Sequence, residues 1–118
     1  MGKLQVLFHV NEVDRWDVSL GNIANLFDDA GEGNVDAIVL ANGHAVAAYA
    51  DAAKVEKIKD FSGKGVKFLA CRNSLRKMCS GGVVCINEEN LPPFVTVVPA
   101  GITEIIKKQR EGYAYVKP

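Results

Sequence analysis

The sequence predicts an α/β fold, a three-layer sandwich with a mainly parallel five-stranded sheet, built from residues 1–118 as a single domain. Short and nearly continuous apolar runs begin near residues 4, 36, 66 and 95. Their separation of about thirty residues is the length of a βαβ unit. Amphipathic segments lie between the runs. This combination is typical of parallel strands whose two faces are both covered by helices.

Each element follows from its local pattern. In the first predicted helix, Leu20, Ile23 and Phe27 share one face, and Gly31 follows its end. Asn42-Gly43 ends the second strand, and Gly112 ends the last helix. The predicted strands are 4–10, 35–41, 66–70, 94–98 and, at an edge, 113–116. The predicted helices are 18–30, 45–61, a short helix from Asn73 or Ser74, and 102–111. The second of them could be broken near Asp51.

This topology predicts where a site should lie. In open parallel sheets, ligands bind beyond the carboxyl ends of the strands. The polar or flexible residues at those ends are Asn11 after the first strand, Asn42, Gly43 and His44 after the second, Cys71 after the third and Gly101 after the fourth.

Cys71 stands directly before a predicted helix N-terminus, where backbone N–H groups and the helix dipole stabilise an anion. Arg72 and Arg76 add positive charge, and both effects favour the nucleophilic thiolate. The competing interpretation is a small buried apolar residue, which is common for a free cysteine. With three cysteines the chain has no complete disulfide set, so at least one thiol should be free. Cys79 and Cys85 are interpreted as ordinary loop or core residues, or as resolving partners for an oxidised Cys71.

The charge distribution excludes some functions. The net charge is zero, which argues against a nucleic-acid binder. Residues 1–52 nevertheless hold two basic and eight acidic side chains, and residues 53–118 hold twelve basic and six acidic ones. Cys71 therefore lies in the positive half of the chain.

No resident cofactor or metal is indicated. The cysteine spacing C-x₇-C-x₅-C lacks the closely paired ligands of structural zinc sites. There is no GxGxxG motif and no phosphate-binding P-loop. His9, inside the first strand, is interpreted as a structural histidine. With no signal-peptide pattern and no apolar run of membrane-spanning length, we expect a cytoplasmic protein that does not associate with membranes.

Taken in order, several short stretches suggest a family. They are Phe8 to Asn11, Trp16, Asn25-Leu26, Asn42 to Val46, Ala70 to Leu75, Val97 to Gly101 and Gln109 to Pro118. With these stretches the chain resembles the small stand-alone members of the DsrE/DsrF-like family, which have the YchN-like fold. The resemblance implies homo-oligomers, either trimers or hexamers, and intracellular sulfur trafficking between donor and acceptor proteins.

The residue that matches the family's sulfur-carrying cysteine is Cys71. The resemblance therefore implies that Cys71 carries sulfane sulfur as a persulfide and passes it to a partner thiol. Two alternatives stay open: a non-catalytic module that binds a small anion or nucleotide-like ligand, and a thiol redox sensor that pairs Cys71 with Cys79 or Cys85. The expected binding residues around Cys71 are Asn11, Asn42, Gly43, His44, Arg72, Asn73, Ser74, Arg76 and Gly101.

Overall fold

The computed structural model describes residues 2–82 and 85–118, and a five-stranded sheet in the order β4-β3-β2-β1-β5 lies at its centre. All four strand pairings are parallel, which confirms the predicted fold class. The third strand runs one residue further than predicted, so that it ends at Cys71 itself. The strands are β1 (Leu4–Val10), β2 (Val35–Ala41), β3 (Lys67–Cys71), β4 (Val95–Val98) and β5 (Ala114–Val116).

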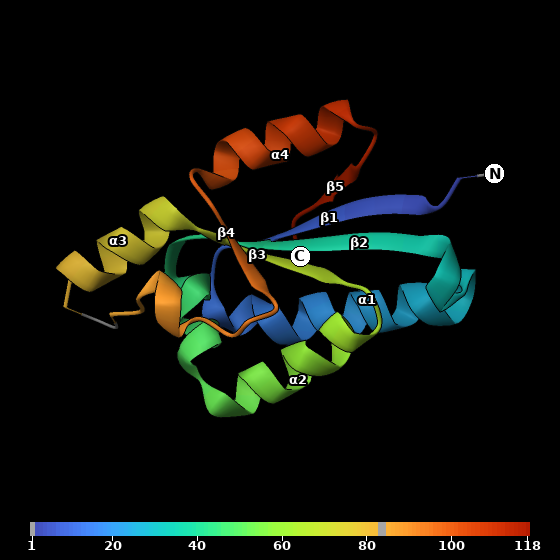
Figure 1. The fold of residues 1–118 in the computed structure, drawn as a ribbon. Coiled ribbons are helices and arrows are strands. Elements are labelled where there is room, and N and C mark those ends of the chain that lie inside the picture. The colour runs from blue at the N-terminus through green and yellow to red at the C-terminus, as the bar shows by residue number, and fades with distance from the viewer. Residues whose placement is uncertain (1, 83–84) are drawn as a thin grey trace.

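Helices cover both faces of this sheet (Figure 1). Helices α1 (Trp16–Ala30) and α2 (Ala52–Gly63) pack on one face, and α4 (Gly101–Arg110) lies on the other. Helix α3 (Arg72–Ser80) follows β3 directly and extends beyond the carboxyl end of the sheet. The described residues also include three single turns of 3-10 helix: η1 (Val13–Arg15), η2 (Glu32–Asn34) and η4 (Glu88–Asn90). No helix within the described ranges is both long and apolar enough to cross a membrane.

The predicted helix 45–61 is two elements. Residues Gly43–Ala50 form a 3-10 helix, η3, and α2 begins only after Asp51. The Asp51 carboxylate accepts hydrogen bonds from the N–H groups of Ala53 and Lys54, at 3.0 and 3.3 Å, and so caps α2. The question of continuity near Asp51 is thereby resolved as a break.

Two buried side chains fix η3 beneath the sheet. The Trp16 indole N–H donates to the carbonyl of Ala45 at 2.9 Å, and the Tyr49 hydroxyl donates to the carbonyl of Leu69 at 3.1 Å. Because both groups are buried, an unmade hydrogen bond at either would cost about 1–3 kcal/mol. Gly43, the first residue of η3, is therefore held at a defined place beside the carboxyl end of β2.

The sheet has one hydrophobic core on each face, and successive side chains of β3 point alternately into the two cores. Phe68 and Ala70 belong to the larger core beneath α1 and α2, whereas Leu69 belongs to a smaller core. The smaller core is completed by Leu7, Ile38, Leu40, Val98, Ile105 and Tyr113. Successive side chains of a strand point to opposite faces, so Cys71 lies on the face of Leu69, the face covered by α4.

Candidate functional site at the carboxyl end of the sheet

Cys71 is the meeting point of two helix N-termini. It is the N-cap residue of α3, with extended backbone angles, and the N–H of Gly101, the first residue of α4, donates to its Sγ at 3.4 Å. The predicted convergence of strand ends thus places Gly101 against Cys71. Cys71 is only 5% exposed, but its sulfur faces polar N–H groups at the edge of the sheet.

These surroundings shift the pKa of the Cys71 thiol. Burial is the largest single influence and raises the pKa, because it penalises the charged thiolate. Hydrogen bonds from the Ser74 hydroxyl and from the N–H groups of Ser74, Gly101 and Asn73 act in the opposite direction. Together they outweigh burial, and the pKa lies below its ordinary value. The site therefore favours an anionic sulfur, as the sequence predicts, through hydrogen-bond donors of both helices.

Ser74 is oriented from the neighbouring strand. The N–H of Gly43 donates to Ser74 Oγ at 2.7 Å, which leaves the hydroxyl proton free to point at Cys71. Gly43 has φ +57°, in the left-handed region that favours glycine. A Cβ at Gly43 would lie 3.1 Å from the carbonyl oxygen of Asn11, so the three predicted residues Asn11, Gly43 and Ser74 are brought together.

A second hydrogen-bonded chain joins the edge strand to Asn42. His9 lies between them: its Nε2 is 2.8 Å from Asn42 Oδ1, and its Nδ1 is 2.6 Å from the hydroxyl of Tyr115. His9 is thus linked to one of the predicted binding residues, in addition to its place in β1. Sequence reasoning missed this link and missed Tyr115 entirely. The available signal was positional, because β1 lies between β2 and the edge strand β5, and His9 is near the carboxyl end of β1.

Arg72 and Arg76, the two cations predicted to stabilise the Cys71 thiolate, do not donate to its sulfur. The Arg72 guanidinium makes two hydrogen bonds to the Glu88 carboxylate, at 2.9 and 3.1 Å, and these lower the pKa of Glu88. Arg76 is exposed, and its charge also acts on Glu88. Arg72 and Arg76 therefore face an acidic partner in the η4 turn, and the donors at the sulfur belong to Asn73, Ser74 and Gly101.

His44 lies beside the site on its solvent side. It is exposed and lines a shallow cavity of about 270 Å³ with Gly43 and Ser74, and with Lys77, Met78 and Gly81 of the α3 end. Cys71 is not among the residues that line this cavity. His44 therefore shares Gly43 and Ser74 with the sulfur site and approaches them from outside.

The other two cysteines form a disulfide bond, Cys79–Cys85, and Cys71 is free. The interpretation of Cys79 and Cys85 as ordinary loop or core residues, or as resolving partners of Cys71, is therefore wrong. The bond joins the last turn of α3 to the segment that follows residues 83–84, and both residues are exposed. The expectation of a free thiol is confirmed for Cys71.

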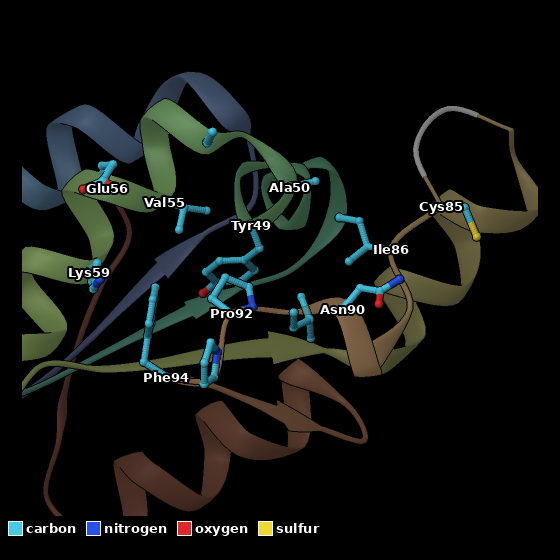
Figure 2. A pocket seen from close by; sticks show the side chains of 13 residues that line it. Tyr49, Ala50, Val55, Glu56, Lys59, Cys85, Ile86, Asn90, Pro92 and Phe94 are labelled. Carbon is cyan, nitrogen blue, oxygen red and sulfur yellow. The ribbon is translucent and has the colours of Figure 1, made fainter.

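A larger groove, of about 700 Å³, is lined by Cys85 but not by Cys71 (Figure 2). It runs between η3, α2 and the segment before β4, and Tyr49, Val55, Ile86, Pro92 and Phe94 point into it. None of the predicted site residues lines it. Across residues 2–82 and 85–118, no three or more His, Cys, Asp or Glu side chains are grouped to hold a metal ion.

Comparison with known proteins identifies a family and two similar structures. The model of the DsrE/DsrF-like family matches residues 34–118, which include Asn42, Cys71, Ser74 and Gly101. Among solved structures, the chain is similar to MTH1491 of Methanobacterium thermoautotrophicum, described as a protein of unknown function. The two are 32% identical over 96% of this chain and 97% of that one, with a TM-score of 0.81.

The fold is also shared with the YchN protein of E. coli. That similarity covers the whole of both chains at 14% identity, with a TM-score of 0.70. No match was found among curated proteins. On the family model and the MTH1491 similarity together, the chain belongs to the DsrE/DsrF-like family.

Proposed function

We propose that the protein carries sulfane sulfur as a persulfide on Cys71 and passes it to a partner thiol in the cytoplasm. The observation that carries this proposal is the set of donors around Cys71 Sγ, which outweighs burial and lowers the pKa of the thiol. A thiolate is the form that attacks sulfur. Family membership supports the proposal.

The transfer consists of two exchange steps. The Cys71 thiolate attacks the outer sulfur of a donor persulfide R–S–SH; the new S–S bond forms as the donor S–S bond breaks, and RS⁻ leaves. A partner thiolate then attacks the outer sulfur of the Cys71 persulfide, and Cys71 leaves as the thiolate. The sulfane sulfur keeps its oxidation state, so neither step needs an external oxidant, reductant or metal.

The donor set around Cys71 suits both steps. In each step Cys71 Sγ is a thiolate, first as nucleophile and then as leaving group. Hydrogen bonds to an ionised group contribute about 1.5–3 kcal/mol each. N–H groups held at the starts of α3 and α4 need no rearrangement to stabilise that charge.

A homo-oligomer is the second part of the proposal. Ile102 and Ile106 are 65% and 50% exposed and lie one turn apart on α4. Two large apolar side chains on one solvent-facing stripe support a contact between copies of the chain, in trimers or hexamers. Light scattering of the purified protein beside Ile102→Lys tests this: the wild type should be larger than a monomer, and the variant should dissociate.

The carrier proposal is tested by sulfur loading. The folded protein is incubated with inorganic polysulfide, and intact mass and peptide mapping are compared with Cys71→Ser. One added sulfur on the Cys71 peptide, removable by a thiol reductant and absent from the variant, is the expected result. The double variant Cys79→Ser, Cys85→Ser keeps Cys71 and should load normally. An unmodified Cys71 in the folded wild type would falsify the carrier proposal.

Small-anion binding is the second candidate, favoured by the same convergence of two helix N-termini. It predicts that phosphate shifts the amide NMR signals of Asn73, Ser74 and Gly101 equally in the wild type and in Cys71→Ser. A redox sensor that pairs Cys71 with Cys79 or Cys85 has no support in the structure, because those two cysteines are bonded to each other.

A further inference from the structure

The chain of hydrogen bonds from Tyr115 through His9 to Asn42 has a defined direction. The Asn42 oxygen can only accept, so His9 Nε2 carries the proton and donates to it at 2.8 Å. In a neutral imidazole, Nδ1 is then the acceptor, and the Tyr115 hydroxyl donates to it at 2.6 Å. The hydrogen bond from Tyr115 thus fixes the tautomer of His9, and the hydrogen bond from His9 holds the Asn42 amide with its oxygen toward the ring.

With the oxygen so fixed, the Asn42 amide nitrogen is on the other side of the amide. A Cβ built on Gly101 would lie 3.6 Å from Asn42 Nδ2 and 3.4 Å from Leu40 Cδ2, which is ordinary contact distance. Gly101 therefore leaves methyl-sized room beside the Asn42 NH₂ group. Among the residues that the structure describes, the side-chain hydrogen bond of Asn42 is made by its oxygen, and no buried side-chain nitrogen or oxygen is left without a partner, so the Asn42 NH₂ group reaches solvent and is free to donate.

Gly101 also contacts the Cys71 sulfur through its backbone. The same Gly101 that borders the Asn42 amide donates its own N–H to Cys71 Sγ at 3.4 Å. A persulfide places its outer sulfur about 2.05 Å beyond Sγ. The N–H donors already described are directed at Sγ, and the Asn42 NH₂ group is the further donor on the Gly101 side.

We propose that Asn42 Nδ2 donates a hydrogen bond to the outer sulfur of the Cys71 persulfide, and that His9 and Tyr115 are positioning residues that hold its amide in that orientation. The inference rests on the proposed function. It assigns a separate donor to each sulfur: the starts of α3 and α4 stabilise Sγ, and Asn42 stabilises the terminal atom. This donor favours the anionic form of the outer sulfur, which resists attack by a thiolate, so the sulfur stays bound until it is protonated and passes to a partner thiol.

The experiment measures persulfide lifetime on Cys71. Wild type, Asn42→Ala, His9→Ala and His9→Gln are loaded with polysulfide, and loss of the added sulfur to a small thiol is followed by intact mass. Asn42→Ala and His9→Ala should shorten the lifetime on the order of tenfold, as for a lost hydrogen bond to a charged group. His9→Gln should restore most of it, because an amide N–H can replace the Nε2 donor.

Two further readouts separate positioning from a general loss of structure. The pH profile of Cys71 alkylation without loaded sulfur should be unchanged in Asn42→Ala, because its donor serves the outer sulfur only. Tyr115→Phe, at an edge position that is 39% exposed, should shorten the lifetime, whereas Tyr113→Phe should not. Tyr113 is the matched control, because its hydroxyl donates to Asp36 at 2.7 Å and not to His9.

The outcomes are distinguishable. If the wild type takes up no sulfur at Cys71, the carrier proposal fails and this inference fails with it. If the wild type loads normally but folded Asn42→Ala and His9→Ala keep its persulfide lifetime, only the positioning chain is refuted. A shortened lifetime that His9→Gln does not restore also overturns the role given to His9.

Discussion

The N–H of Gly43 donates to Ser74 Oγ at 2.7 Å, and this hydrogen bond joins residues 31 positions apart in the chain. It ties the turn after β2 to the first turn of α3. The Ser74 hydroxyl is then left with one proton, which it donates to the Cys71 sulfur. The turn after β2 thus orients one of the groups that lower the pKa of the thiol at the end of β3.

Ser74→Ala should raise the pKa of Cys71. The Ser74 hydroxyl is the first of the hydrogen-bonding groups that lower this pKa, and without it burial has more effect. The pH profile of alkylation by iodoacetamide, which follows the thiolate, should shift to higher pH. Ser80→Ala is the matched control, since the Ser80 hydroxyl bonds only to the carbonyls of Arg76 and Lys77 at the far end of α3. An unmoved profile in Ser74→Ala would contradict the assignment.

Stability should depend on pH through Cys71. Its pKa is lower in the folded state than in the unfolded chain, so the folded state binds fewer protons between those two pKa values. The contribution is therefore full above the unfolded pKa and is lost as the pH falls through the folded one. The difference in unfolding free energy between the wild type and Cys71→Ser, from urea titrations at several pH values, should increase with pH across this window. A difference that is flat or falls with pH contradicts the shift.

Gly43→Ala should destabilise the protein. A left-handed conformation costs a side chain about 1–2 kcal/mol, and the new Cβ would lie 3.1 Å from the Asn11 carbonyl oxygen. Gly21→Ala is the control, because Gly21 is inside α1 with no atom within 4 Å of an added Cβ. That exchange should stabilise by about 0.5–1 kcal/mol, as for glycine in a helix interior. Thermal unfolding of both variants checks the opposite signs.

Cys71 should discriminate between reagents by size. At 5% exposure it admits a small electrophile far better than a bulky one. Relative to a free cysteine in a peptide, iodoacetamide should react with Cys71 faster than Ellman's reagent does, after each is corrected for the thiolate fraction. Equal relative rates for the two reagents would mean that the sulfur is open to large partners without local rearrangement.

The fold could be predicted from the sequence because the patterns that indicate strands and helices are local. Apolar runs such as Val35–Ala41 mark strands on their own, and the rule for parallel sheets then groups Asn42, Cys71 and Gly101 at one edge. What the sequence could not give is side-chain direction over long separations. Arg72 pairs with Glu88 over 16 positions and His9 with Tyr115 over 106, and no local pattern predicts either contact. The Cys79–Cys85 bond likewise has no signal in the cysteine spacing.

Gly101→Ala should reduce sulfur loading on Cys71 without lowering the melting temperature. The added methyl meets Leu40 and Asn42 at 3.4–3.6 Å, within ordinary contact, and alanine leaves the unfolded chain less conformational freedom than glycine does. The melting temperature should therefore hold or rise. The methyl also fills the room assigned to the outer sulfur, so polysulfide should load much less sulfur on Cys71, as seen by intact mass. Gly63→Ala, at the end of α2 with no atom within 4 Å of its Cβ, should load like the wild type. Normal loading in Gly101→Ala would place the outer sulfur elsewhere and leave the Asn42 amide without the role assigned to it.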